Sequence, residues 1–313
     1  MLLSRRNRRA GGAFRAEGDR AFDGVCPYLF PIGLSNGVSG DWAKIYQDQE
    51  LGGTMRIFIV LWLVLFSVNV FAADIGVVIL HAKGGSPDGK NIRPAIDALE
   101  AAGMEVIAPE MPYSRNRRYD ADYMEALNEV ERAVNQLKAN GAKSVFVAGQ
   151  SQGANTAIGY GAFKGGVDGI LATAPGHVVE LREFQKRVEG SPQKAAKMVA
   201  DGKGNEKDEF TDLNQGKTYT VYTTAAIYHS WFADDGPAVT PNNVRNLKAP
   251  LFWAVGDQDR MHERGPAYAF AKAPENPLNE YVVVSGGHGR TMVEAKSQMV
   301  AWIKKVHASK SKF

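Results

Sequence analysis

The chain has 313 residues, enough for one large domain or two smaller ones, and its 44% hydrophobic and 23% charged residues are typical of a soluble protein. The net charge is +3, but from residue 73 onward 29 Lys and Arg stand against 28 Asp and Glu, so the main body is close to neutral. This balance argues against a nucleic-acid partner bound by broad electrostatic attraction.

Residues 55–72 have the pattern of a secretory signal peptide. The segment MRIFIVLWLVLFSVNVFA has a basic residue, Arg56, next to its first methionine, continues as a short apolar run and has small residues near its end. Val70 and Ala72 fit the signal-peptidase positions, so we predict cleavage between Ala72 and Ala73 and a periplasmic or secreted protein. The alternative is an uncleaved membrane anchor, for which the apolar run is short. Contact with a membrane is therefore expected only during export or through such an anchor.

Residues 1–54 precede this signal, although a signal peptide normally stands at the start of a protein. They show little helical or alternating pattern and contain Cys26, the single cysteine of the chain. We therefore predict that residues 1–54 are a disordered extension from a misassigned start, with Met55 as the initiator. Gly52 and Gly53 fit a translated ribosome-binding sequence just upstream. The mature chain would then hold no cysteine, which fits an extracytoplasmic protein.

Strands and helices are expected to alternate from residue 75 onward. Apolar runs predict strands, and segments with helical spacing or small residues separate them. The predicted strands are 75–81, 104–112, 143–149 and 167–176, and the predicted helices between them are 91–103, 121–141 and 151–163. This alternation predicts βαβ units, and hence a parallel sheet with helices on both faces.

The alternation stops at about residues 177–248 and then resumes. This stretch is first polar and helical, then loop-like and aromatic. Strands return in 249–261 and 278–289, with helices in 264–273 and 290–308. We therefore predict one domain over 73–313, in which 177–248 form a cap over the carboxyl ends of the strands, where open sheets place their sites.

The motif Gly-x-Ser-x-Gly occurs twice. Its first copy, at residues 33–37, has neither a strand before it nor a helix after it. The second, GQSQG at residues 149–153, lies between an apolar strand and a helix of small residues, which is the context that a nucleophilic serine requires. The glycines allow close backbone approach, and the helix N-terminus favours negative charge. We predict that Ser151 is the nucleophile, with a structural turn as the alternative.

A serine nucleophile needs a base and an acid that orients the base. Of the six histidines, His288 alone follows a strand on a glycine-rich loop that can bend towards Ser151. Asp257 and Asp259 both follow the strand predicted in 249–261. Because an Asp directly after a strand often binds its own turn, we favour Asp259 as the acid over Asp257.

The chain resembles the α/β-hydrolase superfamily over about residues 75–307, in particular exported bacterial serine esterases and lipases. The resemblance rests on GQSQG, VGDQDRM, SGGHGRT and LHAKGGSP, with the order Ser151, Asp259, His288. It implies an α/β-hydrolase fold, with a mostly parallel open sheet, helices on both faces and a helical cap. It implies a serine hydrolase that cleaves a carboxylic ester of a small acyl substrate through an acyl-enzyme on Ser151. An amide or peptide hydrolase resembling serine aminopeptidases, and a binding protein that kept the fold, are the alternatives.

The resemblance also implies an oxyanion hole made of backbone amides. Family members often carry His-Gly after the first strand, whereas this chain has His81 and Ala82. The amide of Ala82 or Lys83 is expected to act with that of Gln152. For His81 itself, a hydrogen bond that fixes this loop is a simpler role than a catalytic one.

Four residues are candidates for the substrate pocket: His81, Arg115, Tyr228 and Trp231. Arg115 either binds an acidic substrate or is solvated, and the two aromatic residues either line the pocket or pack in the cap. The sequence has no His and Cys cluster with metal-ligand spacing and no phosphate-loop motif, so neither a metal nor another cofactor is expected. No oligomeric state is predicted.

Overall fold

The computed structural model describes residues 73–310. The predictions of a misassigned extension at 1–54 and of a signal peptide at 55–72, cleaved after Ala72, lie outside the described residues. Within the part that is described, no helix combines the length and the apolar character that crossing a lipid bilayer requires.

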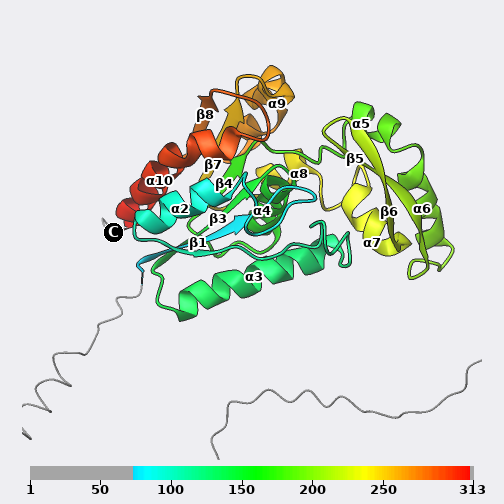
Figure 1. The fold of residues 1–313 in the computed structure, drawn as a ribbon, viewed down its shortest axis with the longest axis horizontal. Helices are drawn as coiled ribbons and strands as arrows, with labels where there is room; N and C mark the ends of the chain where they lie inside the picture. The colour runs from blue at the N-terminus through cyan, green and yellow to red at the C-terminus, as the bar shows by residue number, and fades with distance from the viewer. Residues whose placement is uncertain (1–72, 311–313) are drawn as a thin grey trace, which may run out of the picture. The chain divides into compact units, whose positions relative to one another are not determined.

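A six-stranded sheet forms the centre of the fold, in the order β2-β1-β3-β4-β7-β8 (Figure 1). Every neighbouring pair in it is parallel. The strands are β1 (Ile75–Leu80), β2 (Glu105–Ile107), β3 (Ser144–Gln150), β4 (Gly169–Thr173), β7 (Leu251–Gly256) and β8 (Glu280–Val284). They coincide with the six predicted strand segments, so the predicted parallel α/β class is confirmed. Strand β2 is shorter than predicted, since Pro109 and Pro112 lack the N–H groups that a longer ladder needs.

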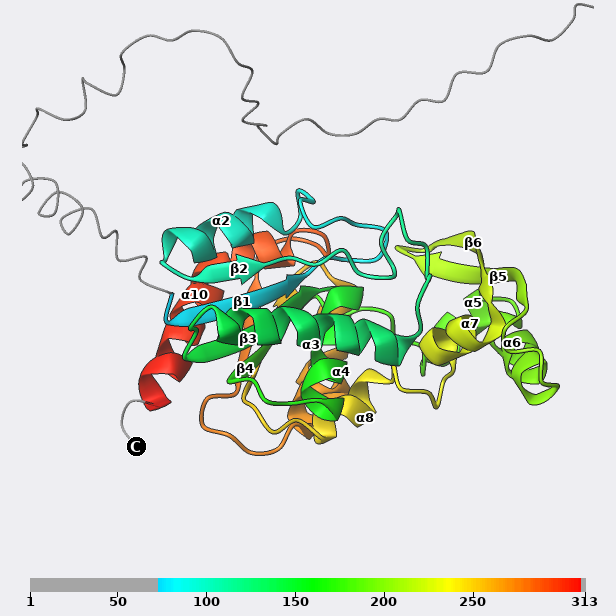
Figure 2. The ribbon, with the colours of Figure 1, turned by 90° about the horizontal axis from the view of Figure 1, so that it is seen from below.

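Helices cover both faces of this sheet, as predicted. Helices α2 (Arg93–Ala101) and α10 (Thr291–Lys310) lie on one face, and α3 (Tyr123–Ala139) and α4 (Gln152–Phe163) on the other (Figures 1 and 2). The short helix α8 (Thr240–Arg245) packs against α4. Along β3, Phe146 packs on the α10 side and Val145 and Val147 on the α4 side. Two covered faces explain why the strands read as continuous apolar runs rather than as alternating ones.

The helix predicted for residues 264–273 is wrong. The structure has α9 (Arg260–Arg264), followed by two short 3₁₀ turns at Pro266–Tyr268 and Phe270–Lys272. Gly265 adopts φ 62° and Ala269 adopts φ −146°, so the backbone leaves the helical region at both points. The apolar residues of this segment suggested a helix, but Gly265 followed by proline ends one.

The inserted segment contains a β-hairpin in addition to the helices of the predicted helical cap. Strands β5 (Lys207–Asn214) and β6 (Lys217–Thr224) pair antiparallel around Gln215 and Gly216, which have φ 48° and 78°. Two positive φ values suit a tight two-residue hairpin turn. The cap helices are α5 (Arg182–Arg187), α6 (Ser191–Ala200) and α7 (Ala225–Phe232). In the sequence, the alternation of Thr with Tyr and Val in TYTVYTT is a pattern typical of a strand, and it coincides with β6.

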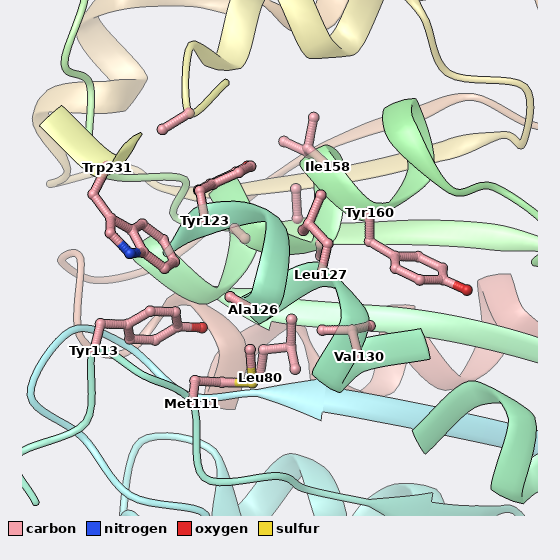
Figure 3. Close-up of a cluster of buried hydrophobic side chains, with 14 of the residues drawn as sticks. Leu80, Met111, Tyr113, Tyr123, Ala126, Leu127, Val130, Ile158, Tyr160 and Trp231 are labelled. Carbon is pink, nitrogen blue, oxygen red and sulfur yellow. The ribbon is translucent and has the colours of Figure 1, made fainter. Parts of the chain in front are cut away.

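Trp231 of α7 fixes the cap on the core. Its ring lies edge-on to Tyr113, Tyr119 and Tyr123, with ring centroids 5.5, 5.6 and 4.8 Å away. Its indole Nε1 donates a hydrogen bond to the carbonyl of Ala121 at 2.9 Å. Figure 3 shows Trp231 beside Tyr113 and Tyr123, at the end of the apolar layer under α3 and α4. The cap therefore rests on a buried aromatic contact, with its polar atom satisfied.

The loops that follow β7 and β8 touch each other at the carboxyl edge of the sheet. The amide of Gln258 donates to the carbonyl of Gly286 at 3.1 Å, and the amide of Asp257 donates to the carbonyl of Val284 at 2.8 Å. A Cβ on Gly256 would lie 2.0 Å from the carbonyl oxygen of Gly286. Only glycine permits this approach, which holds the loops after β7 and β8 against each other.

We expect Gly256→Ala to lower the thermal stability strongly. The added methyl group must displace backbone rather than a side chain, a strain of about 2–3 kcal/mol. For a domain of this size that shift corresponds to roughly 5–10 °C in Tm, measured by circular dichroism. Gly287→Ala is the matched control, because a Cβ there meets nothing within 4 Å. Equal Tm values for the two variants would contradict the close approach.

Candidate active site

Ser151 occupies a sharp corner between β3 and α4. Its backbone has φ 58° and ψ −115°, a conformation that residues with a side chain seldom adopt. A Cβ on Gly149 would lie 2.1 Å from the carbonyl oxygen of Gly153, and a Cβ on Gly153 would lie 2.4 Å from that of Leu80. The role expected of the two motif glycines, close approach of backbone at the corner, is therefore seen directly. The corner presents the Ser151 hydroxyl at the carboxyl edge of the sheet.

His288 bridges Ser151 and Asp259. Its Nε2 lies 2.9 Å from Ser151 Oγ, and its Nδ1 lies 2.8 Å from Asp259 Oδ2. A carboxylate only accepts hydrogen bonds, so Nδ1 carries the ring proton and the lone pair of Nε2 faces the serine hydroxyl. The structure thus brings together the three residues that the sequence singled out, which are 29 and 137 residues apart along the chain.

The two candidate acids have different partners. Asp257 accepts a hydrogen bond from the amide of Gly286 at 2.8 Å and is exposed, which matches the turn role expected of it. Asp259 is buried, and its second oxygen accepts from the amide of Met261 at 3.0 Å. Burial alone would raise the pKa of Asp259, but hydrogen bonds from His288 and Met261 and nearby positive charge outweigh it and lower the pKa below its usual value. Asp259 is therefore the ionised partner of the imidazole.

The glutamines on either side of Ser151 hold its surroundings, a role that the sequence analysis missed. Gln150 Nε2 donates a hydrogen bond to the carbonyl of His288 at 3.1 Å. The corner at Ser151 is therefore bound directly to the loop that carries His288. Gln152 Oε1 accepts one from the hydroxyl of Tyr119 at 3.0 Å. The sequence signal for these contacts is only the polar character of two residues at a buried position.

A buried ion pair joins the cap to this corner. Lys83 Nζ contacts Asp212 Oδ1 at 2.5 Å and donates to the carbonyl of Leu213 at 3.0 Å, with side-chain exposures of only 8% for Lys83 and 4% for Asp212. The other oxygen of Asp212 lies 3.2 Å from the hydroxyl of Tyr119, which also contacts Gln152. Burial lowers the pKa of Lys83, while the charge of Asp212 opposes that shift. The loop after β1, the cap strand β5 and the serine corner therefore share one polar network.

The three backbone amides expected to form an oxyanion hole are not used in hydrogen bonds within the described part of the chain. Among residues 73–310, the amides of Ala82, Lys83 and Gln152 donate to no protein acceptor. Gln152 begins α4, where an N–H has no carbonyl four residues before it within the helix. His81 Nε2 accepts from the amide of Met111 at 3.1 Å, so its Nδ1 carries the proton and donates to the carbonyl of Ala82 at 2.8 Å. His81 thus fixes the loop, as the simpler interpretation held.

A cavity of about 860 Å³ opens beside Ser151 and His288. Its walls come from the loop after β4, from the cap helix α5, from the β5–β6 turn and from α9. Apolar side chains, among them Leu181 and Phe184, line it together with Ser151. A volume of this size accommodates a small molecule.

The assignment of His81, Arg115, Tyr228 and Trp231 to the pocket is wrong, because none of the four lines this cavity. Arg115 is exposed on the loop after β2. Tyr228 is buried in the cap, stacked between Phe210 and Phe232 with ring centroids 4.5 and 4.1 Å away. These aromatic residues pack the cap core, which was the alternative for them. Within residues 73–310, no group of three or more His, Cys, Asp or Glu side chains is placed to hold a metal ion.

Comparisons with known proteins identify the fold. No protein-family model and no curated protein sequence matches the chain. Among solved structures, DcsB in complex with its substrate analogue superposes with a TM-score of 0.58 at 12% identity, covering 76% of this chain and 92% of that one. A structure of the metagenome-derived lipolytic enzymes LipS and LipT gives 0.53 at 14% identity, with coverages of 75% and 95%. The monoacylglycerol lipase of Paleococcus ferrophilus gives 0.53 at 17% identity, with coverages of 74% and 94%. The chain therefore has the fold of the α/β-hydrolase superfamily.

Proposed function

We propose that the protein is a serine hydrolase that cleaves carboxylic esters through an acyl-enzyme on Ser151. The observation that carries the proposal is the hydrogen-bonded series from Ser151 Oγ through His288 to Asp259 at the wall of a cavity. A serine hydroxyl becomes a useful nucleophile when a neutral imidazole can take its proton and a carboxylate holds that imidazole in the correct tautomer.

The proposed reaction has two halves. Ser151 Oγ attacks the acyl carbon while its proton passes to His288 Nε2, and the carbonyl oxygen becomes an oxyanion. The C–O bond to the alcohol then breaks, and His288 returns the proton to the leaving oxygen. Water attacks the acyl-serine in the same way, with His288 again as base, and releases the acid and the free serine.

The oxyanion would be bound by the amide of Gln152 together with that of Lys83 or Ala82. Such donors act on charge that develops only during the reaction, and each is typically worth about 3 kcal/mol. Asp259 would stabilise the imidazolium formed at His288. Since its pKa lies below the usual value, Asp259 would stay ionised through the mildly acidic range in which that role is needed.

Esters are favoured as substrates over amides by the comparison with solved structures. A lipolytic enzyme and a monoacylglycerol lipase are among the structures that the chain resembles in fold. Fold alone does not fix chemistry, so an amide or peptide hydrolase and a non-catalytic binding protein are alternative outcomes of the tests. The availability of the three loop and helix amides supports turnover rather than binding alone.

We further propose that residues 55–72 direct export and are removed after Ala72, so that the working protein starts at Ala73 in the periplasm or outside the cell. The pattern of a basic start, a short apolar run and small residues at the end supports this proposal. Contact with a membrane would be limited to export. The expected partner of the exported protein is a small acyl ester, as the proposed reaction requires.

Ser151→Ala should lower ester hydrolysis by at least about 10⁴-fold, since the acyl acceptor is lost. Circular dichroism and Tm should stay close to those of the parent, because only one hydroxyl is removed. A fluorophosphonate probe should label the parent at Ser151 and leave the variant unlabelled. If the probe labels Ser151 and the protein hydrolyses amides but no ester, the amide alternative is favoured. A parent protein that the probe does not label would contradict a catalytic serine.

Asp259→Asn should reduce kcat about a thousand-fold or more, because an amide at this position cannot stabilise the imidazolium and favours the wrong tautomer. Asp257→Asn is the matched control and should cost less than about tenfold, since its Oδ1 still accepts from the amide of Gly286. Steady-state kinetics on one aryl ester measure both. A greater loss with Asp257→Asn would reverse the assignment.

A gene that starts at Met55 should yield an exported protein whose first residue is Ala73. Export follows from the signal pattern, and β1 begins only at Ile75, so removal of earlier residues leaves the sheet intact. Intact mass and N-terminal sequencing of the periplasmic fraction measure the outcome. A membrane-bound product that retains residues 55–72 would instead identify an anchor.

A further inference from the structure

The wall of the active-site cavity carries an excess of positive charge. The lining includes two acidic side chains, Glu183 and Asp259, against six basic ones: Lys83, Lys186, Arg187, Arg260, Arg264 and Arg290. The body of the protein from residue 73 onward is nearly neutral, so this excess is local. Clustered like charge in a cleft raises the local concentration of ligands of opposite sign.

Some of these charges are already compensated. Lys83 is paired with Asp212, and Asp259 is engaged by His288. Arg290 pairs with Glu294 one helical turn along α10. Arg264 approaches Glu183 at 3.9 Å, with exposed side chains on both sides, so that contact contributes little.

Lys186, Arg187 and Arg260 remain without such a partner. Among the described residues, no carboxylate oxygen lies within 4.0 Å of any of the three. Arg187 donates one hydrogen bond to the carbonyl of Gly216 at 2.6 Å, a neutral acceptor that leaves its charge uncompensated. All three side chains are exposed at the cavity wall, so a solute can reach them.

These three side chains come from two sides of the cavity. Lys186 and Arg187 end the cap helix α5, whereas Arg260 begins α9 in the core (Figure 1). Arg260 directly follows Asp259 and opens the five-residue helix α9.

We propose that the substrate of this site carries an anionic group, a carboxylate or a phosphate, in addition to the ester. The inference rests on the proposed ester hydrolysis and adds the substrate class. Lys186 and Arg187 from the cap and Arg260 from the core would hold the anion while the ester lies at Ser151. Arginine binds both kinds of oxyanion through paired N–H groups, and lysine adds a point charge.

The test uses pairs of esters that differ in one anionic group. Mono(4-nitrophenyl) glutarate against 4-nitrophenyl pentanoate places a carboxylate on the acyl side. For the alcohol side, 4-butyryloxybenzoate is compared with its methyl ester, and 4-butyryloxyphenyl phosphate with 4-butyryloxyanisole. At low ionic strength we expect kcat/KM for at least one anionic member to exceed that of its neutral partner about tenfold. Because the basic groups are exposed, the preference should shrink as salt is added.

Variants of the three basic residues test whether these residues cause the preference for anionic esters. The triple change Lys186→Gln, Arg187→Gln, Arg260→Gln should lose most of the preference, chiefly through a higher KM for the anionic ester. The matched control changes Lys203→Gln, Lys207→Gln and Lys304→Gln, again two exposed cap residues and one exposed core residue, and should keep the parental ratio.

The outcomes separate the two proposals. If the protein hydrolyses neutral esters but shows no preference for any anionic partner, or if the triple variant keeps the preference, the anionic substrate is refuted while ester hydrolysis stands. If no ester is hydrolysed and the fluorophosphonate probe does not label Ser151, the proposed function itself fails. A preference confined to the phosphate ester or to a carboxylate ester identifies which anion the site takes.

Discussion

The positive φ of Ser151 is the constraint around which the site is built. A conformation of this kind costs about 1–3 kcal/mol and persists only when the surrounding structure enforces it. Here three backbone segments enforce it, because β1, the corner itself and the loop after β4 pack with no space for a side chain at Gly149, Gly153 or Gly176. The hydroxyl is consequently held at one place on the sheet edge, and the loops that carry His288 and Asp259 are arranged around that place.

The corner also connects the parts of the molecule that must act together. Gln150 binds the carbonyl of His288, while Gln152 reaches through Tyr119 to the buried pair of Lys83 and Asp212. Removing two charges from water is costly, so this pair is weak evidence for stability. Its geometry nevertheless ties the cap hairpin to the loop after β1, and the Trp231 contact supports the attachment of the cap through apolar packing.

Electrostatics distinguish two regions of the candidate site. Near the serine the charges are compensated and hydrogen-bonded, and the lowered pKa of Asp259 means that the interaction with His288 is present at neutral pH and is lost as the pH falls through the depressed value. Further out, on α5 and α9, Lys186, Arg187 and Arg260 have no carboxylate oxygen within 4.0 Å among the described residues. The first arrangement suits proton transfer and the second suits attraction of an anion.

The sequence by itself determined the strand–helix alternation, the serine corner and the identity of its partners, because these depend on local patterns. Apolar runs, a glycine on each side of Ser151 and the position of Asp259 two residues beyond Asp257 are all features of short stretches. Only the tertiary structure decided the β-hairpin in the cap, the burial of Tyr228 and Trp231 away from the cavity, and the pairing of Lys83 with Asp212, which is 129 residues distant. The physical reason is that a contact between distant residues depends on how the inserted segment folds back over the sheet, and no local spacing encodes that path.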